Sequence, residues 1–107
     1  MTDKRLLLST AGSREEANRI ASELVGRRLV ACVNIVGPMT SCFRWKSKVQ
    51  TSEEFLLIIK TTVAQFAAVR DAILELHSYE LPELIQIPIE NGLEEYLNWI
   101  AESVDES

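Results

Sequence analysis

Apolar residues recur along this chain at two spacings, and each spacing predicts one type of secondary structure. Short alternating or continuous apolar runs predict strands, and apolar residues three or four positions apart predict amphipathic helices. The expected strands cover residues 6–10, 29–36, 39–49, 53–62 and 83–89, with the second and third joined through a kink. The expected helices cover residues 13–26, 62–77 and 93–104.

Two of the expected helices begin at a capping-box spacing. Ser13 lies three positions before Glu16, and Thr62 lies three positions before Gln65. In a capping box each side chain bonds the free backbone N–H of the other residue. We therefore expect both pairs to start a helix.

The longest extended region runs from residue 29 to residue 62. Residues 29–36 are apolar except for Asn34, which predicts a strand buried on both faces. Gly37-Pro38 predicts a kink, and the polar run Gln50-Thr51-Ser52 predicts the turn of a long antiparallel hairpin. Such a hairpin would project beyond a core of this size, and a bare strand edge invites pairing with another chain. This favours an oligomer.

The order of the elements predicts the fold class. Strand, helix, strand, strand, helix, strand describes a split βαβ, the α+β ferredoxin-like sandwich (βαββαβ), here with a long hairpin between its second and third strands and an extra C-terminal helix. At 107 residues we expect one domain over residues 1–107. Both crossover helices would cover one face of the sheet, so the other face needs a cover from the last helix or from neighbouring subunits.

The charge is negative overall and unevenly distributed. Residues 1–50 hold nine Lys/Arg and four Asp/Glu, a balance of +5, and residues 51–107 hold two and twelve, a balance of −10. A net charge of −5 without a basic cluster argues against nucleic acid as a partner. The asymmetry fits either two solvated faces or copies that meet head to tail.

Several expectations concern the compartment. No apolar run is long enough to cross a membrane, and the first apolar segment is too short for a signal-peptide core. The two cysteines form no CxxC pair. We therefore expect a cytoplasmic protein with reduced thiols and no membrane partner.

Five short motifs together resemble one known family over residues 6–104. In order they are Ala31-Cys32-Val33-Asn34-Ile35, Trp45-Lys46, Leu57-Ile58-Ile59-Lys60-Thr61, His77-Ser78-Tyr79-Glu80-Leu81-Pro82-Glu83 and Tyr96-Leu97-Asn98-Trp99. The chain resembles the CutA divalent-cation tolerance family. The resemblance implies a ferredoxin-like fold, a homotrimer, a role in metal tolerance with copper foremost, and an architecture akin to PII-type signalling trimers.

Three positions depart from the usual pattern of this family. Ser78 stands where Pro is usual, Phe43 where Tyr is common, and Ser47 where Gly is common. The first change makes the loop after His77 less rigid, and the second removes a hydroxyl. Both bear on the fine geometry of a site rather than on the fold.

The candidate metal ligands are Cys32, His77 and Glu80. Cys32 is a soft ligand suited to copper, and the imidazole and carboxylate of the other two suit a divalent ion. Each has a structural alternative: free cysteine is commonly a small core residue, and a single histidine often caps helix carbonyls. Cys42 does not lie at a ligand spacing from Cys32.

The alternative function is a PII-like sensor or adaptor that binds a small ligand or a protein partner in clefts between subunits. Arg44, Trp45, Lys60, Thr61 and Tyr79 are the candidate cleft residues. No catalytic triad order or glycine-rich phosphate loop is present, so the sequence predicts no enzyme.

Overall fold

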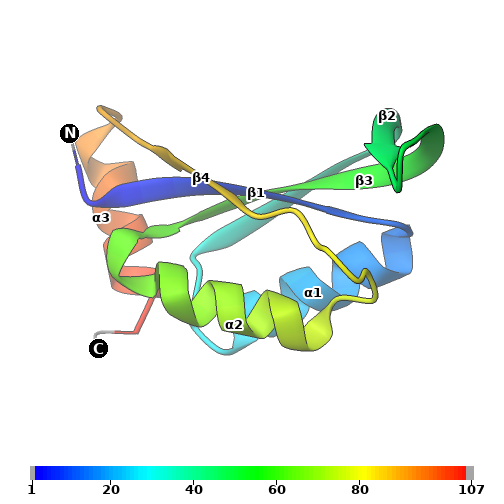
Figure 1. The fold of residues 1–107 in the computed structure, drawn as a ribbon. Coiled ribbons are helices and arrows are strands. Elements are labelled where there is room, and N and C mark those ends of the chain that lie inside the picture. The colour runs from blue at the N-terminus through cyan, green and yellow to red at the C-terminus, as the bar shows by residue number, and fades with distance from the viewer. Residues whose placement is uncertain (1, 106–107) are drawn as a thin grey trace.

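The computed structural model describes residues 2–105, which form a sheet with two helices packed on one face (Figure 1). The elements in these residues are β1 (Lys4–Ala11), α1 (Arg14–Gly26), β2 (Cys32–Trp45), β3 (Lys48–Thr62), the 3-10 helix η1 (Val63–Gln65), α2 (Phe66–Leu76), β4 (Ile85–Pro88) and α3 (Glu94–Ser103). The strand order is β2-β3-β1-β4, and every neighbouring pair is antiparallel. This is the predicted ferredoxin-like split βαβ arrangement.

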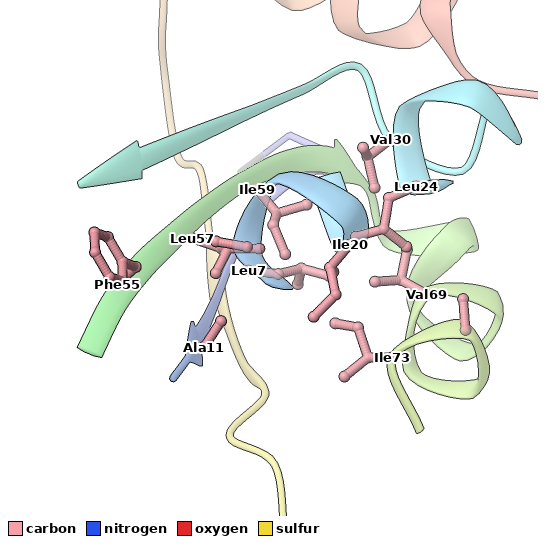
Figure 2. Close-up of a cluster of buried hydrophobic side chains, with 12 residues drawn as sticks. Leu7, Ala11, Ile20, Leu24, Val30, Phe55, Leu57, Ile59, Val69 and Ile73 are labelled. Carbon is pink, nitrogen blue, oxygen red and sulfur yellow. The ribbon is translucent and has the colours of Figure 1, made fainter. Parts of the chain in front are cut away.

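The core lies between the sheet and the pair α1 and α2 (Figure 2). Strand alternation places Leu7 of β1 and Leu57 and Ile59 of β3 on the helix-facing side of the sheet. The helical stripe of α1 brings Ile20 and Leu24 against them, and all five side chains are at most 1% exposed. The apolar residues that alternate along the strands and those that follow the helical spacing in α1 therefore pack together in one core.

The hairpin turn lies at Lys46 and Ser47, not at the predicted residues 50–52. Both turn residues have positive φ, 50° and 68°, and Trp45 pairs with Lys48 across the turn. Two consecutive positive φ angles are typical of the two-residue turn whose twist matches that of antiparallel strands. Residues 50–52 are consequently paired within β3, and the hairpin is longer than predicted.

The kink predicted at Gly37-Pro38 is a shift of register inside one continuous strand. The pairing of β2 with β3 is interrupted between Val36 and Met39 and then resumes. Arg14 of α1 donates from Nη2 to the Gly37 carbonyl at 3.2 Å, and its guanidinium lies 4.8 Å from the centre of the Phe55 ring. A Cβ at position 37 would lie 2.7 Å from Phe55 Cδ2, so the strands approach closely only because residue 37 is glycine.

The prediction that residues 29–36 are buried on both faces is wrong. β2 is an edge strand that pairs only with β3, and its exposure alternates between partly buried and exposed residues. Val36 is 51% exposed, and Asn34 is also exposed. The helices cover one face of β2, and nothing within residues 2–105 covers these side chains on the other.

One predicted capping box is formed in part, and the other is wrong. Ser13 Oγ accepts the Glu16 N–H at 3.1 Å, as predicted, but the Glu16 carboxylate accepts from Gly12 and Ser78 instead of Ser13. Thr62 precedes η1 without a side-chain cap. Gln65 donates from Nε2 to the Asp105 carbonyl at 2.6 Å, so it anchors the segment after α3.

The sheet face opposite α1 and α2, called here the open face, is mainly apolar. Alternation in β1, β3 and β4 directs Leu6, Leu8, Leu56, Ile58, Ile85 and Ile87 to it. Figure 1 shows α3 at the end of the sheet where β1 begins rather than along this face. Ile85 and Ile87 are 50% and 39% exposed.

β4 covers residues 85–88 and is shorter than the predicted strand over residues 83–89. Within residues 2–105 no helix is long and apolar enough to cross a membrane.

Candidate functional site

The loop between α2 and β4 is held by the side chain of His77. The His77 ring is fully buried; its Nε2 lies 2.6 Å from the Thr10 carbonyl of β1, and its Nδ1 lies 3.0 Å from the Tyr79 amide nitrogen. A carbonyl only accepts and an amide N–H only donates, so this network assigns the neutral tautomer with the proton on Nε2. Both ring nitrogens are used by the backbone, so the ring connects β1 to the loop and neither caps α2 nor offers a free lone pair.

Glu16 holds the same loop from α1. Its Oε2 accepts the Ser78 N–H at 2.8 Å, and Arg19 Nη2 lies 3.7 Å from that oxygen. Burial opposes ionisation of this carboxyl, but the hydrogen bonds from Ser78 outweigh it and leave the pKa of Glu16 below its ordinary value of 4.5. The ionised carboxylate therefore stabilises the folded loop.

Acid is expected to weaken the fold partly through Glu16. The pKa of this carboxyl is lower in the folded protein than its value of about 4.5 in the unfolded chain. The carboxylate therefore stabilises the folded state fully at pH values above 4.5, and this contribution is lost as the pH falls through the lower pKa of the folded state. Glu16→Gln should cost about 1–2 kcal/mol at pH 7, because a hydrogen bond to a charged group becomes one to a neutral amide. Urea unfolding between pH 3 and about pH 7 should show a smaller acid dependence in this variant than in the unchanged protein. Glu15→Gln, one position away and exposed, is the control, and equal acid dependence in all three proteins would contradict the prediction.

Tyr79 connects the loop to the hairpin. Its hydroxyl donates to Glu54 Oε2 of β3 at 2.8 Å, and its ring lies 4.6 Å from the His77 ring, centre to centre. Burial, followed by the hydrogen bond and charge of Glu54, raises the pKa of Tyr79 to about 12. The phenol is therefore a neutral donor at physiological pH, and it fixes the position of the Glu54 carboxylate.

A cavity of about 820 Å³ lies between this loop and the outer half of the hairpin. Its lining includes the aromatic residues Phe43, Trp45 and Tyr79 and the carboxylates Glu54, Glu80 and Glu83. A volume of this size is typical of small-molecule sites.

The three predicted metal ligands lie in different places. Cys32 begins β2 on the open face, partly exposed, with its Sγ 3.7 Å from Asn34 Oδ1. His77 is buried beneath the loop, and Glu80 lines the cavity. Among the described residues of one chain, no group of three or more His, Cys, Asp or Glu side chains is arranged to hold a metal ion. The structural alternative for Cys32, a small core residue, is met only in part, because the residue is partly exposed within one chain.

The five predicted cleft residues separate into two groups. Trp45 and Tyr79 line the cavity together, and Arg44 is exposed near the turn. Lys60 and Thr61 lie at the other end of β3, on the order of 35 Å from Arg44 at about 3.3 Å per residue. Lys60 Nζ donates to Asn34 Oδ1 at 2.5 Å, and the buried Thr61 hydroxyl donates to the Leu29 carbonyl at 2.7 Å. Thr61 therefore has a structural role within the chain.

Glu54 is the residue of this region that the sequence analysis missed. It is 8% exposed, although it is a carboxylate. The sequence carried no clear signal for its burial, because alternation puts Glu54 on the opposite face of the strand from the core residues Phe55, Leu57 and Ile59. The sequence does not say that Tyr79, far along the chain, supplies its hydrogen-bond donor.

Known proteins and solved structures match this chain over most of its length. The sequence model of the CutA1 divalent ion tolerance protein family matches residues 5–103. The chain is 49% identical over 96 residues to the divalent-cation tolerance protein CutA of Archaeoglobus fulgidus, covering 90% of this chain and 93% of that protein. The crystal structure of CutA1 from Oryza sativa superposes with a TM-score of 0.95 at 38% identity, covering 97% of this chain and 95% of the other. The divalent cation tolerance protein of Thermus thermophilus superposes with a TM-score of 0.93 at 41% identity, covering 95% and 99%. The chain therefore belongs to the CutA1 family of divalent ion tolerance proteins.

Proposed function

We propose that this protein is a homotrimer that acts in the response to divalent metal ions and binds copper or another divalent cation. Membership of the divalent ion tolerance family carries the proposal. The name of that family concerns tolerance rather than catalysis, and we propose no enzymatic activity. The cytoplasmic location stays a prediction from the sequence.

The open face and the edge strand support the trimer. Ile85, Ile87 and Val36 are each between 39% and 51% exposed, and burying the exposed part of such a side chain contributes about 1 kcal/mol. β2 also leaves one edge of its long hairpin unpaired within residues 2–105. Pairing of hairpin strands with neighbouring chains would cover both features.

Among the three candidate ligands, the structure favours Cys32 for metal binding. Its thiol is partly exposed on the open face, whereas both ring nitrogens of His77 are already bonded. Assembly through the open face would bring Cys32 thiols of different chains toward a shared surface. Thiolates are soft ligands that bind copper and zinc. A site built from several chains agrees with the lack of a three-ligand group in one described chain.

The alternative of a PII-like sensor receives less support. A cleft that uses all five predicted residues would need Lys60 and Thr61 from one chain beside Trp45 and Tyr79 from another, and Thr61 is buried. That alternative stays a prediction.

Light scattering and equilibrium dialysis test the proposal together. We expect a mass of three copies of the 12.1 kDa chain at micromolar concentration, and copper retained by the trimer. Cys32→Ser should abolish retention without changing the mass, because a serine hydroxyl lacks the soft sulfur donor of the thiolate. Cys42→Ser, a change at the exposed cysteine of the hairpin, is the matched control and should retain copper. A stable monomer, or full copper binding by Cys32→Ser, would show the proposal to be wrong.

A further inference from the structure

Asn91-Gly92 is an asparagine–glycine pair in the irregular segment between β4 and α3. Both residues are exposed, and neither belongs to a helix or a strand. The other asparagines precede larger residues and lie inside regular elements, Asn18 in α1, Asn34 in β2 and Asn98 in α3. All four lie within residues 2–105, and Asn91 is the one that combines a glycine neighbour with an irregular backbone.

The segment around this pair is fixed at its two ends and not between them. The Ile89 N–H donates to the Lys4 carbonyl of β1 at 3.1 Å, and the Leu93 carbonyl accepts the Leu97 N–H at 3.0 Å where α3 begins. In the described part of the chain, no backbone–backbone hydrogen bond joins residues 90–92 to another segment. The torsion angles of these residues can therefore change while the sheet and α3 stay intact.

The side-chain amide of Asn91 lies beside the backbone nitrogen of the next residue. The Gly92 N–H donates to Asn91 Oδ1 at 3.0 Å, and the Asn91 side chain makes no other hydrogen bond within residues 2–105. Oδ1 is bonded directly to Cγ, so the nitrogen and the carbon that would close a five-membered ring are already neighbours. Glycine has no Cβ, so residue 92 does not obstruct that approach or the torsion angles that it needs.

We propose that Asn91 is a site of spontaneous deamidation, with water as the co-reactant. The Gly92 amide nitrogen loses its proton to a base in the solvent and forms a bond to Asn91 Cγ. The bond from Cγ to the side-chain nitrogen breaks, and that nitrogen takes up a proton and leaves as ammonia, so a succinimide ring remains. Water then adds to either ring carbonyl, and the ring opens to an aspartyl or an isoaspartyl residue. The net reaction consumes one water and releases one ammonia, and nothing is oxidised or reduced.

The modification changes the charge and the backbone directly before α3. Either product adds one carboxylate, which the N-terminal end of a helix tolerates because its dipole is positive there. The isoaspartyl product also adds one carbon to the backbone between the two fixed ends of the segment. That carbon shifts Gly92, where a Cβ would already lie 3.2 Å from Leu97 Cδ2. This inference is separate from the proposed metal response and uses none of its residues.

Peptide mapping of the native assembly after prolonged warm incubation at slightly alkaline pH tests the proposal. A protease that cleaves after glutamate places each asparagine in its own peptide, namely residues 17–23, 24–53, 91–94 and 96–102. Digestion at mildly acidic pH limits further reaction during the assay, because the attacking nitrogen must lose its proton. We expect the mass change of an amide-to-acid exchange in peptide 91–94 and unchanged masses in the other three. Methylation by an isoaspartyl carboxyl methyltransferase should detect the isoaspartyl product in the same samples.

Two glycine variants test the role of residue 92. Gly92→Ala adds a methyl group beside the attacking nitrogen and should slow the conversion of Asn91 by about tenfold or more. The added carbon meets the flexible end of Leu97, so the variant should still fold. Gly26→Ala is the matched control, because position 26 has open space around it and should leave the rate unchanged. Circular dichroism and light scattering verify the fold and the assembly of both variants.

Three results would overturn the proposal. The first is an unchanged peptide 91–94 from the native assembly, and conversion of the same peptide in guanidinium-unfolded chain would then show that the assembly covers or fixes the segment. The second is an equal rate in Gly92→Ala and the unchanged protein, which would exclude attack by the Gly92 nitrogen. The third is conversion of Asn98 as fast as that of Asn91, which would mean that the fold does not select the site. None of these readouts depends on copper retention.

Discussion

Leu57→Ala is expected to lower the free energy of unfolding by about 2–5 kcal/mol. Leu57 is fully buried in β3, between β1 and β2, and its side chain lies in the cluster beneath α1 and α2 (Figure 2). Removing three methyl-sized groups there loses apolar burial and leaves a cavity that the rigid sheet cannot close. Urea unfolding followed by circular dichroism, at one fixed protein concentration, measures the change.

Leu74→Ala is the matched control for this prediction. Leu74 lies on the outer side of α2 and is 60% exposed, so the same chemical change should alter stability by less than about 0.5 kcal/mol. Similar losses for the two variants would show that Leu74 is covered in the assembled protein or that Leu57 is not central to the core.

The helices were predictable from the sequence because local physics determines them. Ser13 caps α1 at the expected position, and α1 ends at Gly26 as expected. The end of α2 next to His77 was also predicted. In each case the apolar stripe and the residues at the helix end act within a few positions of one another, so no distant contact was needed to infer them.

The hairpin was predicted in kind but not in detail because its details depend on tertiary contacts. Lys46 and Ser47 adopt positive φ without the Asn-Gly or Asp-Gly pair that marks such turns, so the polar residues 50–52 were the stronger local signal. The apolar run before Gly37 suggested burial on both faces. In the sheet it belongs to an edge strand, and its exposure alternates between partly buried and exposed residues.

Single candidate residues could be named from the sequence, but which of them lie together could not. The loop with Tyr79 and Glu80 does lie against the hairpin that carries Trp45, and these residues share one cavity. Cys32 lies apart from them, and Glu54 was not considered. A sequence shows which side chains could bind a metal ion or a ligand. Which of these side chains lie close together depends on which strands become neighbours in the sheet. His77 illustrates this, because its two hydrogen bonds join segments that are far apart in the sequence.

His77→Ala is expected to cost about 3–5 kcal/mol of folding free energy. The change leaves the Thr10 carbonyl and the Tyr79 N–H without their partner, and each buried polar group left unpaired costs about 1–3 kcal/mol. The lost ring also leaves a cavity. Urea unfolding of His77→Ala, with the exposed neighbour Ser78→Ala as control, measures this cost.

The same pair of variants separates a structural role of His77 from a role as metal ligand. If the ring only connects β1 to the loop, added copper should raise the melting temperature of His77→Ala and of the unchanged protein by the same amount. Loss of that increase in His77→Ala alone would identify His77 as a ligand and would contradict the assignment made from its hydrogen bonds. We expect equal increases, because metal binding at Nε2 would replace the bond to Thr10, and binding at Nδ1 would displace the Tyr79 N–H from a loop that also positions Tyr79 toward Glu54.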